Sequence, residues 1–238
     1  MADSHATAVE AAVPNPELRH HFADMEQQKN AASLGMWLFL VTEIMFFGGM
    51  FCAYLIYRFR YFDAFAAGSQ SLDVRLGAFN TAVLLVSSLT VVLAVRAAQD
   101  GKRHQLVAYL AITVVLGLTF LGVKAVEYAE KFEKHHVPGP TFQFTDTYNR
   151  NGEQVHLNAD EVPHAQMFFA VYFAMTGMHA LHMIIGCGLF TVLAVLAWKG
   201  RYSPGYFTPI ENGGLYWHLV DIIWIYLFPL LYLIDRHH

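Results

Sequence analysis

Five runs of apolar residues, each long enough to cross a lipid bilayer, dominate this 238-residue chain. An α-helix rises about 1.5 Å per residue, so about 20 residues span a hydrocarbon core of roughly 30 Å. The runs lie at about 33–57, 76–96, 106–131, 165–198 and 213–234. None of them alternates strictly between apolar and polar residues, as the strands of a membrane barrel do. The predicted fold class is therefore an all-α integral membrane protein, a bundle of five transmembrane helices.

The remaining segments are polar. Only 14% of the residues are charged, against about 25% in soluble domains, and a net charge of -4 does not favour a nucleic-acid partner. We expect a polar N-terminal segment over 1–32 and a single membrane domain over 33–238. The extramembrane loop 132–164 contains Asn151-Gly152, a turn signal, and a small hairpin is one of two equal interpretations of it. A surface that contacts a partner subunit is the alternative for this loop.

Glu43 lies near the middle of the first apolar run. A carboxyl group at this depth costs several kcal/mol unless it is protonated, paired or turned towards other protein. Three interpretations stay open: a structural carboxyl group hydrogen-bonded within the bundle, a proton-relay group facing a catalytic partner, and a lipid-headgroup or ion site. Gly48 and Gly49, with Cys52 and Ala53, form small-xxx-small pairs that allow close helix contact on one face.

The other four helices also carry polar side chains. Such groups turn towards the bundle interior or a partner. We therefore expect a buried polar network of Asn80, Glu127, His179, His182, His218 and Asp221. Lys124 shares a helix face with Glu127, and the alternative for this pair is that both side chains extend to the membrane interface. For His179 and His182 the alternative is a role in hydrogen-bonded packing.

A metal or haem site is another interpretation of His179, His182 and His218, because a helix bundle can hold such a group between facing helices. The chain has no HExxH, ExxH or CxxC pattern to support it. We therefore expect no metal ligands and no catalytic residues in this chain.

The positions of the cysteine and tryptophan residues predict where these side chains lie relative to the bundle and the membrane interface. Cys52 and Cys187 both fall in apolar runs and are expected to be buried and unpaired. Trp37, Trp198 and Trp217 are expected to anchor the helices at the membrane interface.

Five motifs follow one another along the chain. They are TEIMFFGGMFCAY with Glu43, LGAFNTAVLLVSS with Asn80, LGVKAVEYAE with Glu127, TGMHALHMIIG with His179 and His182, and YWHLVDIIW with His218 and Asp221. In this order they resemble subunit III of the haem–copper oxidases, the cytochrome c and quinol oxidase family. The resemblance runs from about Leu34 to Tyr232, and it is to the five-helix bacterial type, which lacks the first two helices of the seven-helix type.

The resemblance implies an inside N-terminus and an outside C-terminus, which an even division of Lys and Arg between the two sides does not decide. It also implies that Glu43 occupies the position of the carbodiimide-reactive carboxyl group. The implied function is that of an accessory, non-redox subunit III of a proton-pumping terminal oxidase, of the cytochrome c oxidase type, in aerobic respiration. Such a subunit docks on subunit I and supports proton uptake and complex integrity.

The implied setting is the bacterial plasma (inner) membrane. Haem and copper are expected in the partner subunits and no cofactor in this chain, with bound phospholipid on the exposed face. Other oxidase subunits and a larger respiratory supercomplex are the further partners that the resemblance allows.

Three rival functions stay open. The first is the related accessory subunit of a nitric oxide reductase, which shares these motifs. The second is a haem- or metal-binding subunit of a quinone oxidoreductase. The third is a stand-alone proton or ion carrier, for which the chain offers few charges inside the membrane.

Overall fold

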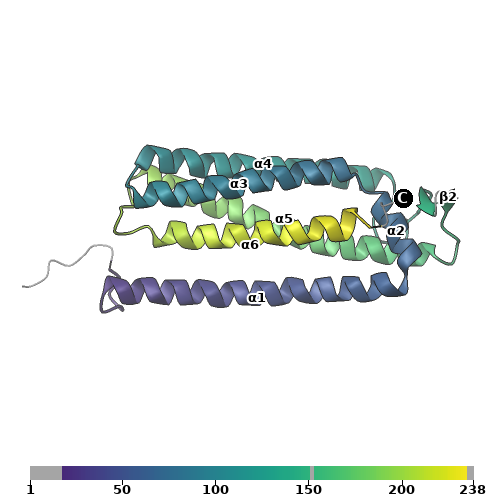
Figure 1. The fold of residues 1–238 in the computed structure, drawn as a ribbon, viewed down its shortest axis with the longest axis horizontal. Helices are drawn as coiled ribbons and strands as arrows, with labels where there is room; N and C mark the ends of the chain where they lie inside the picture. The colour runs from purple at the N-terminus through teal and green to yellow at the C-terminus, as the bar shows by residue number, and fades with distance from the viewer. Residues whose placement is uncertain (1–17, 151–152, 235–238) are drawn as a thin grey trace, which may run out of the picture.

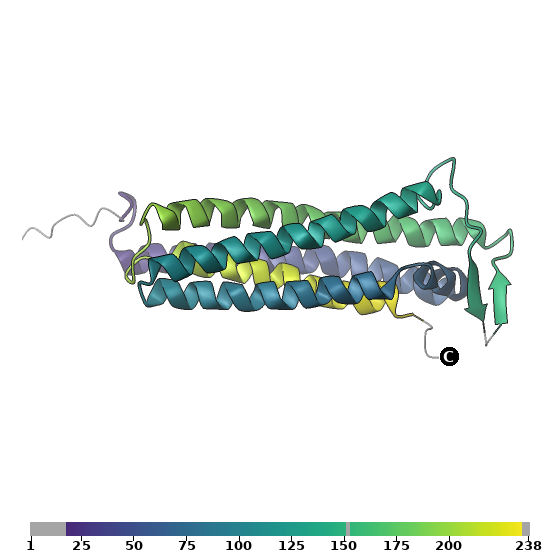
Figure 2. The same ribbon diagram turned by 90° about the horizontal axis from the view of Figure 1, so that it is seen from above.

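The computed structural model describes residues 18–150 and 153–234, and it shows a bundle of long helices with a small cap at one end (Figures 1 and 2). The elements are α1 (Met25–Arg60), α2 (Phe62–Gln70), α3 (Val74–Gln99), α4 (Arg103–Glu133), β1 (Thr147–Arg150), β2 (Glu153–His156), α5 (Val162–Trp198) and α6 (Thr208–Tyr232). Among these described residues, five helices are long and apolar enough to cross a membrane: α1, α3, α4, α5 and α6. The predicted five-helix bundle is therefore confirmed.

The membrane helices begin before the apolar runs that predicted them. α1 begins at Met25, inside the segment expected to be only polar, because Asp24 caps it by accepting a hydrogen bond from the Gln27 amide at 2.7 Å. α6 begins at Thr208 and ends at Tyr232, earlier at both ends than its apolar run. Apolar sequence indicates the part of a helix within lipid, whereas caps set where the helix begins and ends.

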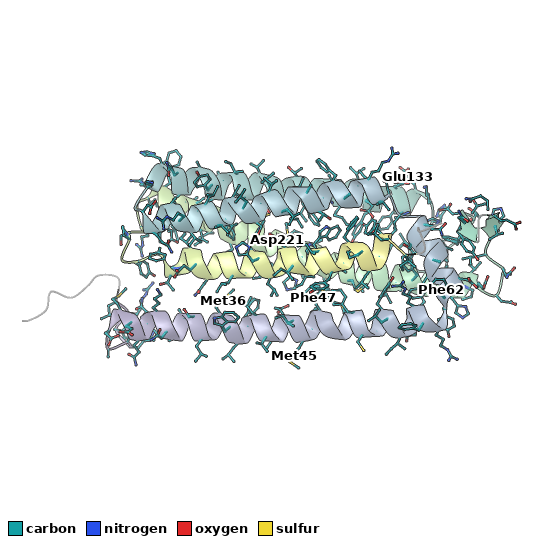
Figure 3. The ribbon with its side chains drawn as sticks, viewed as in Figure 1. Met36, Met45, Phe47, Phe62, Glu133 and Asp221 are labelled. Carbon is teal, nitrogen blue, oxygen red and sulfur yellow. The ribbon has the colours of Figure 1, made fainter. Side chains whose placement is uncertain are left out.

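α1 lies at the side of the bundle, next to α6 and apart from α3 and α4 (Figure 1). Its buried residues are only Leu40, Phe47 and Tyr54, which are spaced seven apart on one stripe. Phe47 points towards α6 and Met45 points away from it (Figure 3). The Tyr54 hydroxyl donates a hydrogen bond to the backbone carbonyl of residue 230, near the end of α6. The buried side chains that attach α1 to the bundle thus lie along a narrow stripe.

The small residues of α1 face away from the rest of the chain, which corrects two expectations. A Cβ atom at Gly48 or Gly49 would meet nothing within 4 Å among the described residues. Cys52 is exposed on the helix surface, whereas Cys187 is buried as predicted, and both thiols are free. The close helix contact that these residues allow is therefore not made among the described residues.

Trp217 is fully buried, and the prediction that it anchors the membrane interface is wrong. Its indole N–H donates a hydrogen bond to Ser87 Oγ at 3.0 Å, and its ring lies against Gly117 and Gly186. The two glycines leave the space that the indole fills, and a sequence does not reveal such complementarity across three helices. Trp37 and Trp198 remain 58% and 70% exposed, as side chains that face lipid or its interface.

A cap covers the end of the bundle where α4 ends and α5 begins. We use this name for α2 and for the described residues of 134–161, which include β1 and β2. The strands pair antiparallel with Thr147 opposite His156, so the predicted hairpin is confirmed, although its turn lies outside the described residues. Gln70 of α2 joins the two parts, because it accepts from the Asn149 amide at 2.7 Å and donates to the Asn149 carbonyl at 3.1 Å. α2 itself was not predicted, since nine residues with a short apolar stretch resemble a loop as much as a helix.

Buried His136 makes the stability of the cap depend on pH. Burial lowers the pKa of this imidazole from 6.5 to about 4, and the Asp146 carboxylate, 3.7 Å from Nε2, opposes that shift only in part. As pH falls, the unfolded segment takes up a proton before the folded cap does. The stabilisation is complete above pH 6.5 and is lost progressively down to pH 4, and at pH 5 the loss is about 2 kcal/mol.

Hydrogen exchange of the amides of residues 135–148, followed from pH 7.5 to pH 5 after correction for intrinsic rates, measures this loss. His136→Phe is expected to remove the dependence on pH. His156→Gln, on the exposed strand β2, serves as the matched control and is expected to leave it intact. Equal protection at pH 7.5 and pH 5 in the unaltered protein would contradict the prediction.

Candidate functional site

Glu43, near the middle of α1, meets His182 of α5. Glu43 Oε2 lies 3.0 Å from His182 Nε2, and the two side chains are 19% and 12% exposed. His182 Nδ1 lies 2.8 Å from the carbonyl oxygen of Met178, one turn earlier on α5. The Tyr216 hydroxyl of α6 donates a hydrogen bond to the His182 carbonyl at 2.9 Å. The Phe47 ring of α1 packs edge-on against the His182 imidazole. Three helices thus hold this pair in place.

The hydrogen bonds of His182 determine how many protons the pair can hold. A carbonyl oxygen can only accept, so His182 Nδ1 must carry a hydrogen for its contact with Met178. The 3.0 Å contact between Nε2 and Glu43 then needs one further proton, either on the carboxyl group or on the imidazole. In both forms the pair is neutral overall. The arrangement can therefore move a proton between two residues without leaving a net charge in the membrane.

Lys124 and Glu127 form a second buried site, between α4, α5 and α6. Lys124 Nζ lies 2.9 Å from Glu127 Oε2, and the two side chains are 3% and 2% exposed. The ammonium group also donates to the hydroxyls of Tyr172 and Tyr232, at 3.1 and 3.0 Å. Those hydroxyls donate in turn to Glu127 Oε1, at 2.7 and 2.5 Å. The alternative that this pair extends to the interface is therefore wrong.

Tyr172 and Tyr232 were missed by the sequence analysis. Each lies in an apolar run, and nothing local to it indicates a charged partner. The charges of Lys124 and Glu127 could have indicated them. A buried ion pair needs further hydrogen bonds, so polar side chains on the facing helices are expected beside it.

The other predicted polar residues do not join one network. Ser88 Oγ lies 2.7 Å from His218 Nδ1, and Asp221 lies beside the same serine between α6 and α3 (Figure 3). Asn80 and His179 are fully buried, and their side chains make no hydrogen bonds to other described residues. The structure thus divides the predicted network into the Glu43 pair, the Lys124 site, the His218 group and these two isolated side chains.

The three membrane histidines lie in three different surroundings. His182 pairs with Glu43, His218 contacts Ser88, and His179 packs between the rings of Phe120 and Trp224. Within residues 18–150 and 153–234, no three His, Cys, Asp or Glu side chains come together as a ligand set. Among the described residues these three histidines therefore make separate contacts.

The chain is similar to known proteins along nearly its whole length. The family model described as cytochrome c oxidase subunit III matches residues 18–147 and 157–235. Cytochrome c oxidase subunit 3 of Corynebacterium diphtheriae is 29% identical over 208 residues, which cover 87% of this chain and 89% of that protein. The protein of the same name from Gallus gallus is 29% identical over 211 residues, which cover 83% of this chain and 67% of that protein. Cytochrome bo(3) ubiquinol oxidase subunit 3 of Pseudomonas aeruginosa is 28% identical over 199 residues, covering 84% and 83%.

Proposed function

The chain belongs to the cytochrome c oxidase subunit III family, and from this premise we propose that it is the accessory, non-redox subunit of a proton-pumping terminal oxidase of the cytochrome c oxidase type. The observation that carries the proposal is the family match over both long segments of the chain. In this proposal the chain docks on subunit I in the bacterial inner membrane, with its N-terminus inside. Haem and copper reside in the partner subunits, and phospholipid binds the exposed face of the bundle.

We propose that the Glu43–His182 pair is the proton-linked part of this subunit. The pair is partly exposed at mid-membrane, where a neighbouring subunit or lipid can reach it. Its one shared proton can move between the carboxyl group and the imidazole while the contact is kept, whereas release of that proton removes the hydrogen bond between the two residues. The proposed role is to buffer protons near subunit I during turnover and so to help maintain proton uptake and the integrity of the complex.

We expect the shared proton of the pair to reside on the Glu43 carboxyl group, so that neither residue carries a charge. Two neutral partners avoid the desolvation of two separate charges in the membrane. In infrared spectra of the purified protein, Glu43→Gln is then expected to remove a protonated C=O band. Glu133→Gln, at the exposed end of α4, is the matched control and is expected to leave that band in place. Loss of an ionised carboxylate band instead would show that the pair is a Glu⁻–His⁺ ion pair.

The proposed function is tested by isolating the complex through an affinity tag on this chain. The optical spectrum of the intact complex is expected to show haem, and the separated chain is expected to contribute none of it. Glu43→Gln is expected to leave the initial rate of oxygen reduction largely intact and to change inactivation during turnover or proton uptake. If lifetime and pumping are both unchanged, the pair has only a structural role. Failure to recover any haem-containing partner would overturn the proposal as a whole.

A quinol-oxidising partner is the second candidate, because one relative named above is a subunit of a ubiquinol oxidase. The same purified complex separates the two cases. Rapid oxidation of reduced cytochrome c supports the first, and rapid oxidation of a quinol without cytochrome c supports the second.

A further inference from the structure

The family match leaves out the β1–β2 hairpin of the cap. The family model ends its first segment at residue 147 and resumes at residue 157, so it omits nearly the whole hairpin. Figure 2 shows the two strands beyond the ends of the membrane helices, with β1 between β2 and the bundle. The shared membrane fold therefore does not explain what this hairpin does.

One edge of the hairpin is closed by the chain itself. The side-chain amide of Gln70 accepts from the Asn149 N–H and donates to the Asn149 carbonyl, as a neighbouring strand would. Gln70 ends α2, whose residues from Ala64 to Ser69 are all buried. On β1, the Tyr148 side chain is buried as well. The hairpin thus lies on a packed base.

The opposite edge, along β2, is open. Gln154 lies opposite Asn149, and because the main chain of Asn149 bonds to Gln70, the two residues form a non-hydrogen-bonded pair. The N–H and C=O of Gln154 therefore point away from β1. The two kinds of pair alternate, so the same holds for His156, opposite Thr147. These outward groups make no hydrogen bonds to other described residues.

An edge of this kind can pair with another polypeptide. Proteins usually protect an exposed edge with a proline, a lysine, a bulge or a covering element. Residues 153–156 include neither proline nor lysine, and the side chains of Glu153, Gln154 and His156 are exposed. The unpaired groups of β2 thus match the main chain of an extended segment of comparable length, which is the arrangement used in strand addition.

The charges around this edge select the occupant. Residues 141–161 carry four acidic side chains and one basic side chain, a formal charge of −3: Asp146, Glu153, Asp160 and Glu161, with Arg150. Lysine or arginine side chains in the added strand are therefore favoured. A second copy of this chain would bring two such acidic surfaces together, so the charges favour a different polypeptide.

We propose that β2 receives an extended, basic segment of a neighbouring subunit, which joins the hairpin as a third strand beyond the membrane surface. The main chain of that segment bonds to the outward groups of Gln154 and His156. Its basic side chains lie near Glu153 and Asp160. The proposal rests on the proposed membership of a multisubunit complex and goes beyond it, because it assigns a subunit contact outside the lipid bilayer.

The test is residue-resolved hydrogen exchange, measured on the intact complex isolated through a tag on this chain and on the separated chain. The amides of Gln154 and His156 are expected to exchange freely in the separated chain and at least about tenfold more slowly in the complex. The amide of Val155, which points towards β1, is expected to be protected in both. This alternation distinguishes strand pairing from simple coverage of the hairpin.

Gln154→Pro removes one outward donor and leaves the bonds between β1 and β2 in place, since proline is tolerated on an edge strand where its nitrogen faces away. It is expected to abolish the protection of His156 in the complex, while protection of Val155 shows that the hairpin is still folded. Gln154→Thr keeps the N–H and is the matched control, expected to retain the protection. Glu153→Gln combined with Asp160→Asn is expected to reduce it about threefold.

Carbodiimide cross-linking of the complex identifies the occupant, because it joins a carboxylate directly to a lysine in contact with it. Glu153 or Asp160 is expected to be joined to a lysine of another subunit. A cross-link to a second copy of this chain, or protection of His156 that survives Gln154→Pro, would overturn the proposal. A haem-containing complex in which Gln154 and His156 exchange freely refutes this proposal alone, whereas failure to recover such a complex refutes the proposed function together with it.

Discussion

Glu127→Gln or Lys124→Met is expected to destabilise the bundle by about 3–5 kcal/mol, because each leaves one buried charge without its partner. The ion pair is almost completely enclosed, and both tyrosine hydroxyls are oriented by it. Loss of the carboxylate leaves the ammonium group among the aromatic rings that surround it, where water does not reach. The measurement is the midpoint of unfolding of the purified protein in mixed micelles with increasing denaturing detergent.

Two further variants separate the ion pair from a general effect of mutation. Replacing both partners together, as Lys124→Met with Glu127→Leu, is expected to recover part of the loss, because no unpaired charge remains, while the hydroxyls of Tyr172 and Tyr232 lose their partners. The exposed pair Lys134–Glu130, at 2.7 Å and 45% exposure on both sides, is the matched control on the same helix. Glu130→Gln is expected to change stability by less than about 1 kcal/mol. Equal effects of Glu127→Gln and Glu130→Gln would contradict a buried, interdependent pair.

Gly117→Leu is expected to destabilise the protein by about 1–3 kcal/mol or to displace α6. A Cβ atom at this position would lie 2.7 Å from Cys187 Sγ and 2.8 Å from the Trp217 ring, both of them closer than atoms can approach. The indole cannot move away easily, because it is fully buried and hydrogen-bonded to Ser87. The same unfolding measurement applies, and the fluorescence of Trp217 reports any displacement of the ring.

Gly122→Leu is the matched control, because it changes the same residue type on the same helix. A Cβ atom at Gly122 would meet nothing within 4 Å. Both substitutions raise helix propensity equally, so a difference in stability between the two variants measures the effect of packing alone. If both variants are equally stable, the close approach of Trp217 to α4 does not exist in the folded protein.

The five membrane helices were predictable because lipid imposes a strict length and composition on any segment that crosses it. The cap was predictable only in part. An Asn-Gly dipeptide indicates a hairpin by itself, whereas α2 is stabilised by tertiary burial that its short sequence does not reveal. The burial of Trp217 was mispredicted for the same reason, since it depends on two glycines from other helices.

The candidate site was predictable as a set of residues and not as a set of contacts. Glu43 and His182 were both selected from sequence, because polar groups in lipid require partners. Their contact joins residues 139 positions apart, and no local pattern encodes it. Tyr172 and Tyr232 were not selected at all, although they complete the hydrogen bonds of the Lys124 site.

The sequence by itself determined the number of membrane helices, their approximate spans and the family, because hydropathy and motif order are properties of the chain read in one dimension. The tertiary structure decided which polar side chains pair with each other. Glu43 pairs with His182, Lys124 with Glu127 and two tyrosines, and His218 with Ser88. It also decided that α1 lies apart from α3 and leaves a cleft between them. The physical reason is that every helix in lipid satisfies its own backbone, so its side chains alone select its neighbours.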